Sequence, residues 1–204
     1  MLNKTKYIAI GDSITWTMSN STSADINYYV TGTNQGDYLY PKIFAQSLSN
    51  AGLPIEYINK AIGNTDSNKA ANQNYSWLTS YPADIVSICL GTNDALNTVA
   101  TSQATFLANI NRLITGFKNI NPNVLILLCT PPTMVGTNRP TLSSVLSWIE
   151  SLNNPSTNIG LCRFDTLWTS GQLGTYTGSD QVHPNKSGHA LMGPALYSAY
   201  QSLI

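Results

Sequence analysis

The chain of 204 residues has few charged side chains, which make up 10% of it, against about a quarter in ordinary globular proteins. Ten bases balance ten acids and are scattered along the sequence. This pattern shows no basic stripe for nucleic acid and no patch for an anionic membrane. Hydrophobic residues still make up 42%, which excludes a disordered polar chain. The length suits one domain over residues 1–204 with a substantial core.

Cysteine is also scarce: Cys89, Cys129 and Cys162 each lie in an apolar stretch, and none forms a CxxC pair. An odd count in a chain this long disfavours a disulfide framework and predicts buried free thiols. No run reaches 18 apolar residues, so we expect no membrane span. The apolar run before the first glycine is too short for a signal peptide. The uncharged composition would suit an extracellular or particle-borne part of a longer protein, but no targeting segment fixes a location.

Several familiar motifs are missing. The chain has no GxSxG nucleophile elbow, no phosphate-binding P-loop and no dinucleotide GxGxxG. Its two histidines, His183 and His189, are not accompanied by a cluster of Cys or Glu residues. We therefore expect neither a metal nor a cofactor, and we interpret His189 as a packing or capping residue of the last helix.

What the sequence does contain is an alternation of buried strands and helices. Two of the apolar runs are continuous, as in central strands of a parallel sheet covered on both faces. The predicted strands are 7–10, 55–59, 84–91, 123–130 and 160–166. The predicted helices are 40–52, 102–122, 141–154 and 185–204, with a shorter one around 67–80. This order predicts an α/β fold with a five-stranded parallel sheet between two helical layers.

Four polar segments follow strands or precede the last helix, where ligands bind in such sheets. They read GDSIT with Ser13, NKAIGNTDS with Gly63, GTNDA with Asn93, and SDQVHPNKSGH with Asp180 and His183. A serine nucleophile needs a base, and a histidine base needs a carboxylate to orient it. Ser13, His183 and Asp180 can fill these roles. The N–H groups of Ser13 and Gly63 and the amide of Asn93 can stabilise an oxyanion, and a glycine at 63 would allow close approach.

Each residue also has a structural interpretation. Ser13 and Asp180 could be turn residues, and Asn93 could cap the helix after it. We expect Asp94 to provide that cap and leave Asn93 free, and we expect Asp12 to bond local backbone N–H groups.

Together the four segments resemble the SGNH hydrolase superfamily, the GDSL esterases and lipases, over residues 11–183. The resemblance implies a flavodoxin-like three-layer α/β/α fold. It also implies Ser13 as nucleophile, His183 as base, Asp180 as its partner, and Gly63 and Asn93 in the oxyanion hole. The second segment departs from the family pattern, because Ala61 replaces the first glycine and the later glycine is displaced by one residue. Asn64 could therefore take the role given to Gly63.

The segment 16–39 is long and polar, and it follows Ser13 directly. Such a loop is usually functional or disordered. Its tyrosines Tyr28, Tyr29 and Tyr38, with Tyr40, could form a wall on which a sugar stacks. Alternatively, Tyr38 and Tyr40 pack the start of the first helix.

These observations predict a serine esterase that removes small acyl groups, above all O-acetyl groups on carbohydrate. Its partner would be a small-molecule or glycan ester, with no nucleic acid and no membrane span, and the sequence leaves the oligomeric state open. Two alternatives remain: a lysophospholipase or thioesterase of the same family, and a carbohydrate-binding module that has lost turnover.

Overall fold

The computed structural model describes residues 4–16, 38–96, 101–135 and 140–204. They form a parallel five-stranded sheet in the order β2-β1-β3-β4-β5. The strands are β1 (Thr5–Gly11), β2 (Ile55–Asn59), β3 (Ile85–Cys89), β4 (Leu125–Cys129) and β5 (Ile159–Cys162). The predicted α/β fold and its five strands are thereby confirmed.

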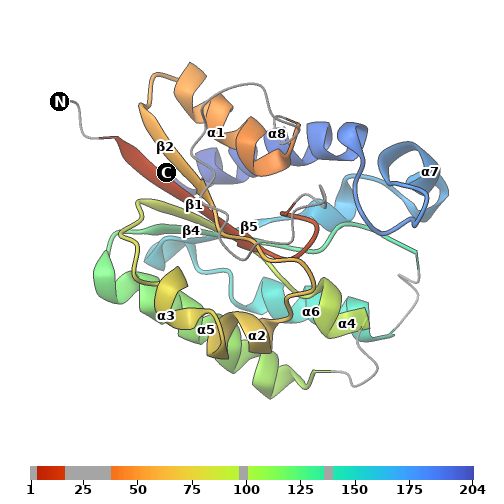
Figure 1. The fold of residues 1–204 in the computed structure, drawn as a ribbon, viewed down its shortest axis with the longest axis horizontal. Coiled ribbons are helices and arrows are strands. Elements are labelled where there is room, and N and C mark those ends of the chain that lie inside the picture. The colour runs from red at the N-terminus through yellow and green to blue at the C-terminus, as the bar shows by residue number, and fades with distance from the viewer. Residues whose placement is uncertain (1–3, 17–37, 97–100, 136–139) are drawn as a thin grey trace.

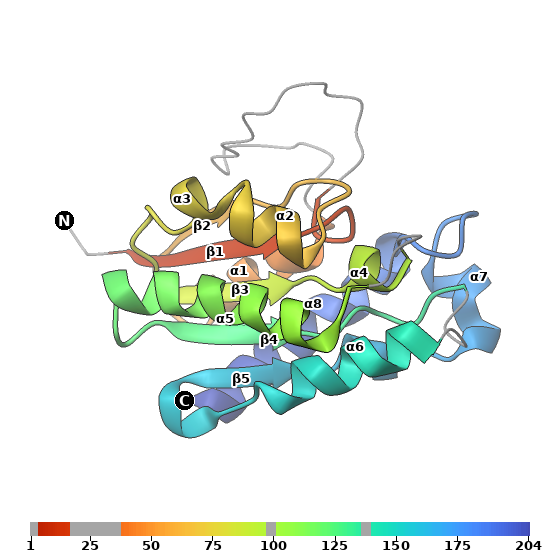
Figure 2. The same ribbon diagram turned by 90° about the horizontal axis from the view of Figure 1, so that it is seen from below.

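Helices cover both faces of this sheet (Figure 1). One layer consists of α1 (Tyr40–Asn50) and α8 (Lys186–Leu203). The opposite layer consists of α2 (Ser67–Asn72), α3 (Tyr75–Leu78), α5 (Gln103–Ile120) and α6 (Pro140–Ser151). Two short helices, α4 (Thr92–Leu96) and α7 (Leu173–Tyr176), lie at the side toward which the strand arrows point (Figure 2).

The sheet is buried because both of its faces pack against an apolar helix stripe. Every residue of β3 is buried, as expected for a central parallel strand. Phe106, Ile110 and Leu113 of α5 pack on one face. On the other face, Phe44 of α1 and Leu196 of α8 join the second core. The α/β alternation of the sequence thus produces two separate cores with the sheet between them.

Two elements depart most clearly from the sequence prediction. The helix expected around 67–80 is two short helices, because α2 ends at Asn72 and the N–H groups of Gln73 and Asn74 both bond to the carbonyl of Lys69. The strand expected over 160–166 ends at Cys162, and Phe164–Thr166 forms a 3-10 turn. The Asp165 carboxylate in that turn accepts hydrogen bonds from Arg163 and from Thr130 after β4.

The three cysteines are free and buried, as predicted. They form a row across the sheet, because Cys89 pairs in register with Cys129, and Cys129 with Cys162. Their exposed fractions are 0%, 1% and 2%. Burial raises the pKa of Cys89 and of Cys129 well above the ordinary thiol value. These thiols are therefore core residues rather than reactive groups.

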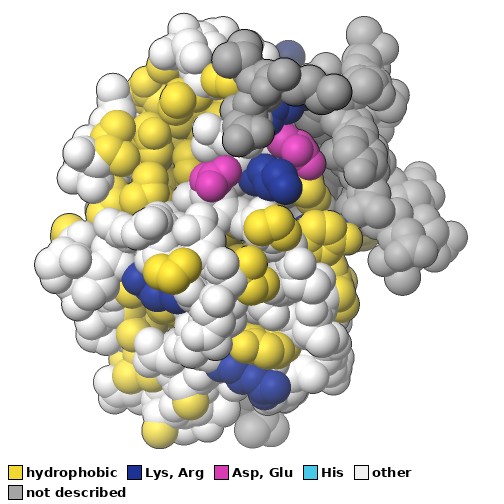
Figure 3. Space-filling view, turned by 90° about the vertical axis from the view of Figure 1, so that its left-hand side faces the viewer, with side chains coloured by type: hydrophobic (Ala, Val, Ile, Leu, Met, Phe, Trp, Pro, Cys, Tyr) yellow, Lys and Arg dark blue, Asp and Glu magenta, His cyan; other side chains and the backbone are white. Residues whose placement is uncertain are grey.

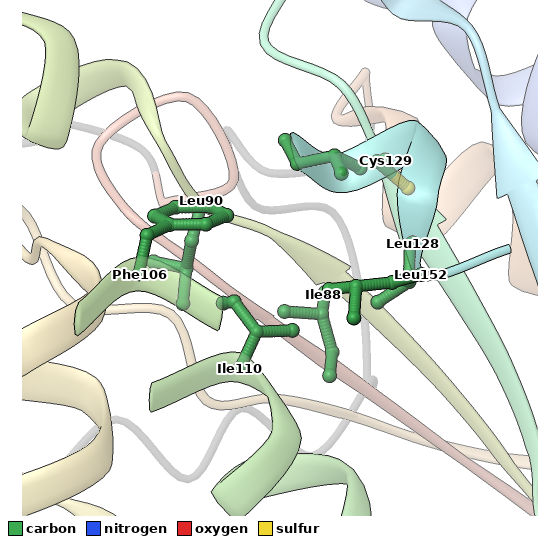
Figure 4. Close-up of a pocket in the computed structure, with 8 residues that line it drawn as sticks. Ile88, Leu90, Phe106, Ile110, Leu128, Cys129 and Leu152 are labelled. Carbon is green, nitrogen blue, oxygen red and sulfur yellow. The ribbon is translucent and has the colours of Figure 1, made fainter. Parts of the chain in front are cut away.

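A small apolar void of about 10 Å³ lies between the sheet and helices α5 and α6 (Figure 4). It is lined by Ile88, Leu90, Phe106, Ile110, Leu128, Cys129, Ile149 and Leu152. A void of this size holds at most one water, and apolar walls offer that water no partners. It belongs to the core and cannot take an acyl chain.

The surface reflects the low charge of the sequence. On the face shown in Figure 3, charged side chains are few, and one basic group lies between two acidic ones in the upper middle of the view. Among the residues described, no helix is both long and apolar enough to cross a membrane.

Candidate active site

The strand order places the first three polar segments side by side. Ser13 follows β1, Gly63 follows β2 and Asn93 lies in α4 after β3, and β1 lies between β2 and β3. All of them stand at the carboxyl edge of the sheet, on the side where α4 and α7 lie in Figure 2. The topology therefore brings together segments that are up to 80 residues apart along the chain.

The fourth segment contacts Ser13 directly. His183 Nε2 lies 2.8 Å from Ser13 Oγ, and His183 Nδ1 lies 2.6 Å from Asp180 Oδ2. Both are hydrogen-bonding distances. The structure thus joins Ser13, His183 and Asp180 in one chain of hydrogen bonds across 170 positions of sequence.

A tight turn holds Asp180 beside His183. Asp180 Oδ1 accepts hydrogen bonds from the N–H groups of Val182 at 2.9 Å and His183 at 3.0 Å. Gln181 between them has a left-handed φ of 56°. Partial burial would raise the pKa of Asp180, but the hydrogen bonds from His183 and from these N–H groups outweigh it, so the pKa lies below its ordinary value. The carboxylate is therefore ionised at neutral pH and can orient the imidazole.

The turn that carries Ser13 is fixed by Asp12 and by neighbouring strands. Asp12 Oδ1 accepts the Ile14 N–H at 2.9 Å, which confirms the local role expected for Asp12. Its other oxygen, Oδ2, is buried and has no hydrogen-bond partner within the described residues. Burial raises the pKa of Asp12 to about 6. The turn closes with N–H groups of Thr15 and Trp16 on the Asp12 carbonyl.

Gly63 faces the indole of Trp16. A Cβ at Gly63 would lie 2.8 Å from two ring carbons of Trp16, closer than real side chains approach. The absence of a side chain at Gly63 thus makes room for the indole. This explanation for a glycine at position 63 differs from the close substrate approach expected from the sequence. The neighbouring residue Asn64 has a left-handed φ of 58°, a conformation that glycine adopts at lower cost.

The backbone donors predicted for an oxyanion are available. Considering the described part of the chain, the N–H groups of Ser13, Gly63 and Asn64 donate to no protein acceptor. Asn93 Nδ2 donates one hydrogen bond to the Thr65 carbonyl at 2.9 Å, which leaves its second hydrogen for a substrate oxygen. The distinction between Gly63 and Asn64 stays open, as it does in the sequence.

Asp94 does not have the role expected from sequence. Its Oδ2 accepts the Ser67 N–H at 2.9 Å, and its Oδ1 accepts the Ser67 hydroxyl at 2.6 Å. The carboxylate therefore serves the start of α2 rather than its own helix. The prediction that Asp94 caps α4 is wrong, because a partner 27 positions away in sequence takes both carboxylate oxygens. Burial raises the pKa of Asp94, although the bonds from Ser67 lower it.

The predicted tyrosine wall is only partly within the described residues. Tyr28 and Tyr29 lie outside them, as does the rest of 17–37. The Tyr38 ring lies 5.8 Å from the His189 ring, at the start of α1. Tyr40 is fully buried, and its hydroxyl lies 2.8 Å from Thr15 Oγ1. Tyr40 is thus a core residue, and a sugar-binding role for Tyr38 stays a prediction.

His189 has the packing and capping role expected for it. It is buried, with an exposed fraction of 4%, and its Nδ1 accepts the Tyr40 N–H at 3.4 Å at the start of α1. Burial lowers the pKa of His189 to about 4, so its imidazole is neutral near pH 7.

Sequence reasoning did not single out Asn59. Its side-chain amide donates to the Thr15 carbonyl at 2.9 Å, and its Oδ1 accepts the Ala61 N–H at 3.0 Å. Asn59 therefore ties the loop after β2 to the turn that carries Ser13. A polar residue at the last position of a predicted strand is the sequence signal that could have identified it.

Comparisons with known proteins identify the family of this chain. The profile of the GDSL-like Lipase/Acylhydrolase family matches residues 9–191. No curated protein sequence gives a significant match.

Solved structures share the fold at low sequence identity. A protein from Parabacteroides merdae described as a GDSL-like lipase superposes with a TM-score of 0.77 at 20% identity, covering 98% of this chain and 97% of its own. An acetyl-xylooligosaccharide esterase from Geobacillus stearmophilus gives a TM-score of 0.72 at 20% identity, with 96% and 93% covered. A family 3 carbohydrate esterase from Talaromyces cellulolyticus gives 0.69 at 17% identity, with 98% and 97% covered.

The range matched by the family profile covers most of the sequence. The chain belongs to the GDSL-like lipase and acylhydrolase family.

Proposed function

We propose that this acylhydrolase removes small acyl groups, in particular O-acetyl groups on carbohydrate, through a Ser13–His183–Asp180 triad. The observation that carries the proposal is the continuous hydrogen-bonded chain, 2.8 Å from Ser13 to His183 and 2.6 Å from His183 to Asp180. A serine in this arrangement has both the base and the oriented tautomer that nucleophilic attack requires.

Acylation begins when Ser13 Oγ attacks the ester carbonyl carbon and its proton moves to His183 Nε2. The carbonyl double bond opens, and the charge on its oxygen is stabilised by the N–H groups of Ser13 and Gly63 and by Asn93 Nδ2. Asp180 stabilises the imidazolium through the bond to Nδ1. The intermediate then collapses, the proton of Nε2 passes to the departing alcohol, and an acyl-Ser13 ester remains.

Deacylation repeats these steps with water. His183 Nε2 takes a proton from the water as its oxygen attacks the acyl carbon, and the same donors stabilise the second oxyanion. Collapse returns the proton to Ser13 Oγ and releases the carboxylic acid. No group besides these side chains and water is needed for the atoms to balance.

A likeness in fold to known esterases supports a small acyl group on a sugar. Among the structural neighbours are an acetyl-xylooligosaccharide esterase and a carbohydrate esterase, although at this identity they establish the fold alone.

A chain-length series tests the proposal. Wild type, Ser13→Ala and Ser80→Ala are assayed on p-nitrophenyl acetate, butyrate and octanoate, and acetate release is measured from acetylated xylo-oligosaccharides. Ser80 is an exposed serine whose hydroxyl donates to the nearby Trp77 carbonyl, and it provides the matched control. We expect the acetate ester to be the best substrate, a loss of at least about 10⁴-fold in Ser13→Ala and normal activity in Ser80→Ala.

The other outcomes point elsewhere. If activity rises toward octanoate, the proposed substrate becomes a lysophospholipid or a thioester in place of a carbohydrate ester. Folded protein that binds acetylated sugar but hydrolyses no ester would make the chain a binding module. Full activity in Ser13→Ala would reject the mechanism.

A further inference from the structure

The oxyanion donors come from two different loops, and the structure shows a buried network that fastens these loops together. Gly63, Asn64 and Thr65 belong to the loop between β2 and α2, whereas Asn93 belongs to α4. Their relative position matters, since a displacement of about 1 Å in a catalytic arrangement can cost about 100-fold in rate.

The network is centred on Asp94, the residue after Asn93. Both oxygens of the Asp94 carboxylate accept hydrogen bonds from Ser67, one from its N–H at 2.9 Å and one from its hydroxyl at 2.6 Å. Asn109 of α5 donates to the same hydroxyl at 3.3 Å. All three residues are buried, with exposed fractions of 1% for Asp94, 0% for Ser67 and 8% for Asn109.

The start of α2 has a local cap besides Asp94. The Asp66 side chain already caps this helix by accepting the Lys69 N–H at 2.8 Å. A buried carboxylate is costly unless its hydrogen bonds compensate it. The bonds of Asp94 therefore add something that the local cap does not: they connect α4 to the first residue after the loop of backbone donors.

A second connection runs in parallel. Asn93 Nδ2 donates to the Thr65 carbonyl at 2.9 Å, so neighbouring residues of α4 hold both ends of the segment 65–67. The same bond fixes the orientation of the Asn93 amide, whose other hydrogen is free to point at substrate. The loop is held from its other side by the contact between Gly63 and the Trp16 indole.

We propose that Asp94 is a positioning residue for ester hydrolysis: through Ser67 it holds the loop of backbone oxyanion donors in register with the Asn93 amide. The inference rests on the proposed function. It assigns Asp94 no contact with substrate, so its effect is exerted through Asn93 and the loop donors and concerns the transition state rather than substrate binding.

The test compares Asp94→Asn, Asn93→Ala and the double variant on p-nitrophenyl acetate. Asp94→Asn keeps the shape of the side chain but loses one of its two acceptor oxygens. We expect kcat to fall about 10- to 100-fold with KM within about twofold, because the loss falls on the transition state. The double variant should be slower than Asn93→Ala by less than the factor that Asp94→Asn costs alone, because part of the effect of Asp94 acts through the Asn93 amide.

Asp84→Asn is the matched control. Asp84 precedes the same strand, β3, at the opposite edge of the sheet, and accepts the Lys6 N–H at 2.8 Å. This variant should keep wild-type kcat. If Asp94→Asn does not fold, Ser67→Ala removes only the hydroxyl and should lower kcat in the same way, by a smaller factor.

Folded Asp94→Asn with kcat within about twofold of wild type would overturn the inference. The inference would also be overturned if the fall in kcat of the double variant equalled the product of the falls in the two single variants. That result is expected when Asp94→Asn disturbs the structure in general and does not act through Asn93. Ser13→Ala separates the two proposals: if it stays active, the proposed function fails, whereas an inactive Ser13→Ala with a fast Asp94→Asn rejects only the role of Asp94.

Discussion

At the scale of single residues, the site depends on contacts that the residue type alone does not reveal. The meeting of Ser13, Asp180 and His183 could be predicted, because Ser13 follows a strand and the other two residues precede the last helix. The partner of Asp94 could not be predicted, because a carboxylate after a strand can cap its own helix or reach another. Only the packing of α2 against α4 and α5 decides between them.

Gly63 gives a prediction at this scale. In Gly63→Ala the new Cβ would lie 2.8 Å from two ring carbons of Trp16, so the indole or the loop must move. We expect a loss of about 1–3 kcal/mol in the free energy of unfolding, from overpacking, and a fall of about 10-fold in kcat/KM. Denaturant unfolding and p-nitrophenyl acetate kinetics measure the two effects.

Gly174→Ala is the control for this substitution. Nothing lies within 4 Å of a Cβ at Gly174, which is in the short helix α7. Alanine there should be neutral or slightly stabilising. If Gly63→Ala behaves like Gly174→Ala, the contact with Trp16 does not constrain the loop.

At the scale of elements, the sequence predicts that a helix or strand exists better than it predicts where that element begins and ends. The α5 stripe of Phe106, Ile110 and Leu113 repeats at helical spacing and packs on the sheet as expected. The segment around 67–80 is less regular, and its break follows from local bonds at Gln73 and Asn74 that no periodicity signals. Such short elements are set by their neighbours rather than by their own pattern.

The contact between α1 and α8 gives a prediction about pH. His189 is neutral and buried, with its pKa lowered from 6.5 to about 4. As the pH falls, His189 is protonated in the unfolded chain before it is protonated in the folded protein. Its contribution to the free energy of unfolding is therefore fully present above pH 6.5 and is lost as the pH falls to about 4. The shift corresponds to roughly 3 kcal/mol. Chemical denaturation of wild type and His189→Asn between pH 7 and 4 should show this loss in wild type only.

Asp12 changes the free energy of unfolding in the opposite direction over much of the same pH range. Its pKa is raised from 3.8 to about 6, so its contribution is full below pH 3.8 and is lost as the pH rises through 6. The difference between wild type and His189→Asn cancels this term, because both proteins keep Asp12. A difference that does not change with pH would contradict the buried, neutral state of His189.

At the scale of the whole molecule, the row of thiols reports on global unfolding. Cys89, Cys129 and Cys162 are almost fully buried on three neighbouring strands of the sheet. We expect no labelling by a thiol reagent at pH 8 in the folded protein, and labelling of all three with one rate under denaturing conditions. Thiol labelling that is quenched at a series of times and followed by mass spectrometry measures the labelling rate of each cysteine. Rapid labelling of one thiol in the native protein would show that its end of the sheet opens locally.

The whole-molecule topology could be predicted because strands and helices alternate along the entire sequence. The segment 17–37 is the exception: its polar, tyrosine-bearing sequence favours neither a wall nor a lid, and it lies outside the described residues. The functional groups of the candidate site can therefore be inferred from the fold more directly than the alcohol part of the ester substrate can.

Covalent labelling of Ser13 tests the proposed mechanism. Wild-type protein is treated with a fluorophosphonate, its intact mass and the modified peptide are measured, and p-nitrophenyl acetate hydrolysis is followed in the same sample. We expect one phosphonyl group per chain, located on Ser13, with activity lost in proportion to labelling and no labelling of Ser13→Ala. Modification at another residue, or full hydrolysis by completely labelled protein, would contradict it.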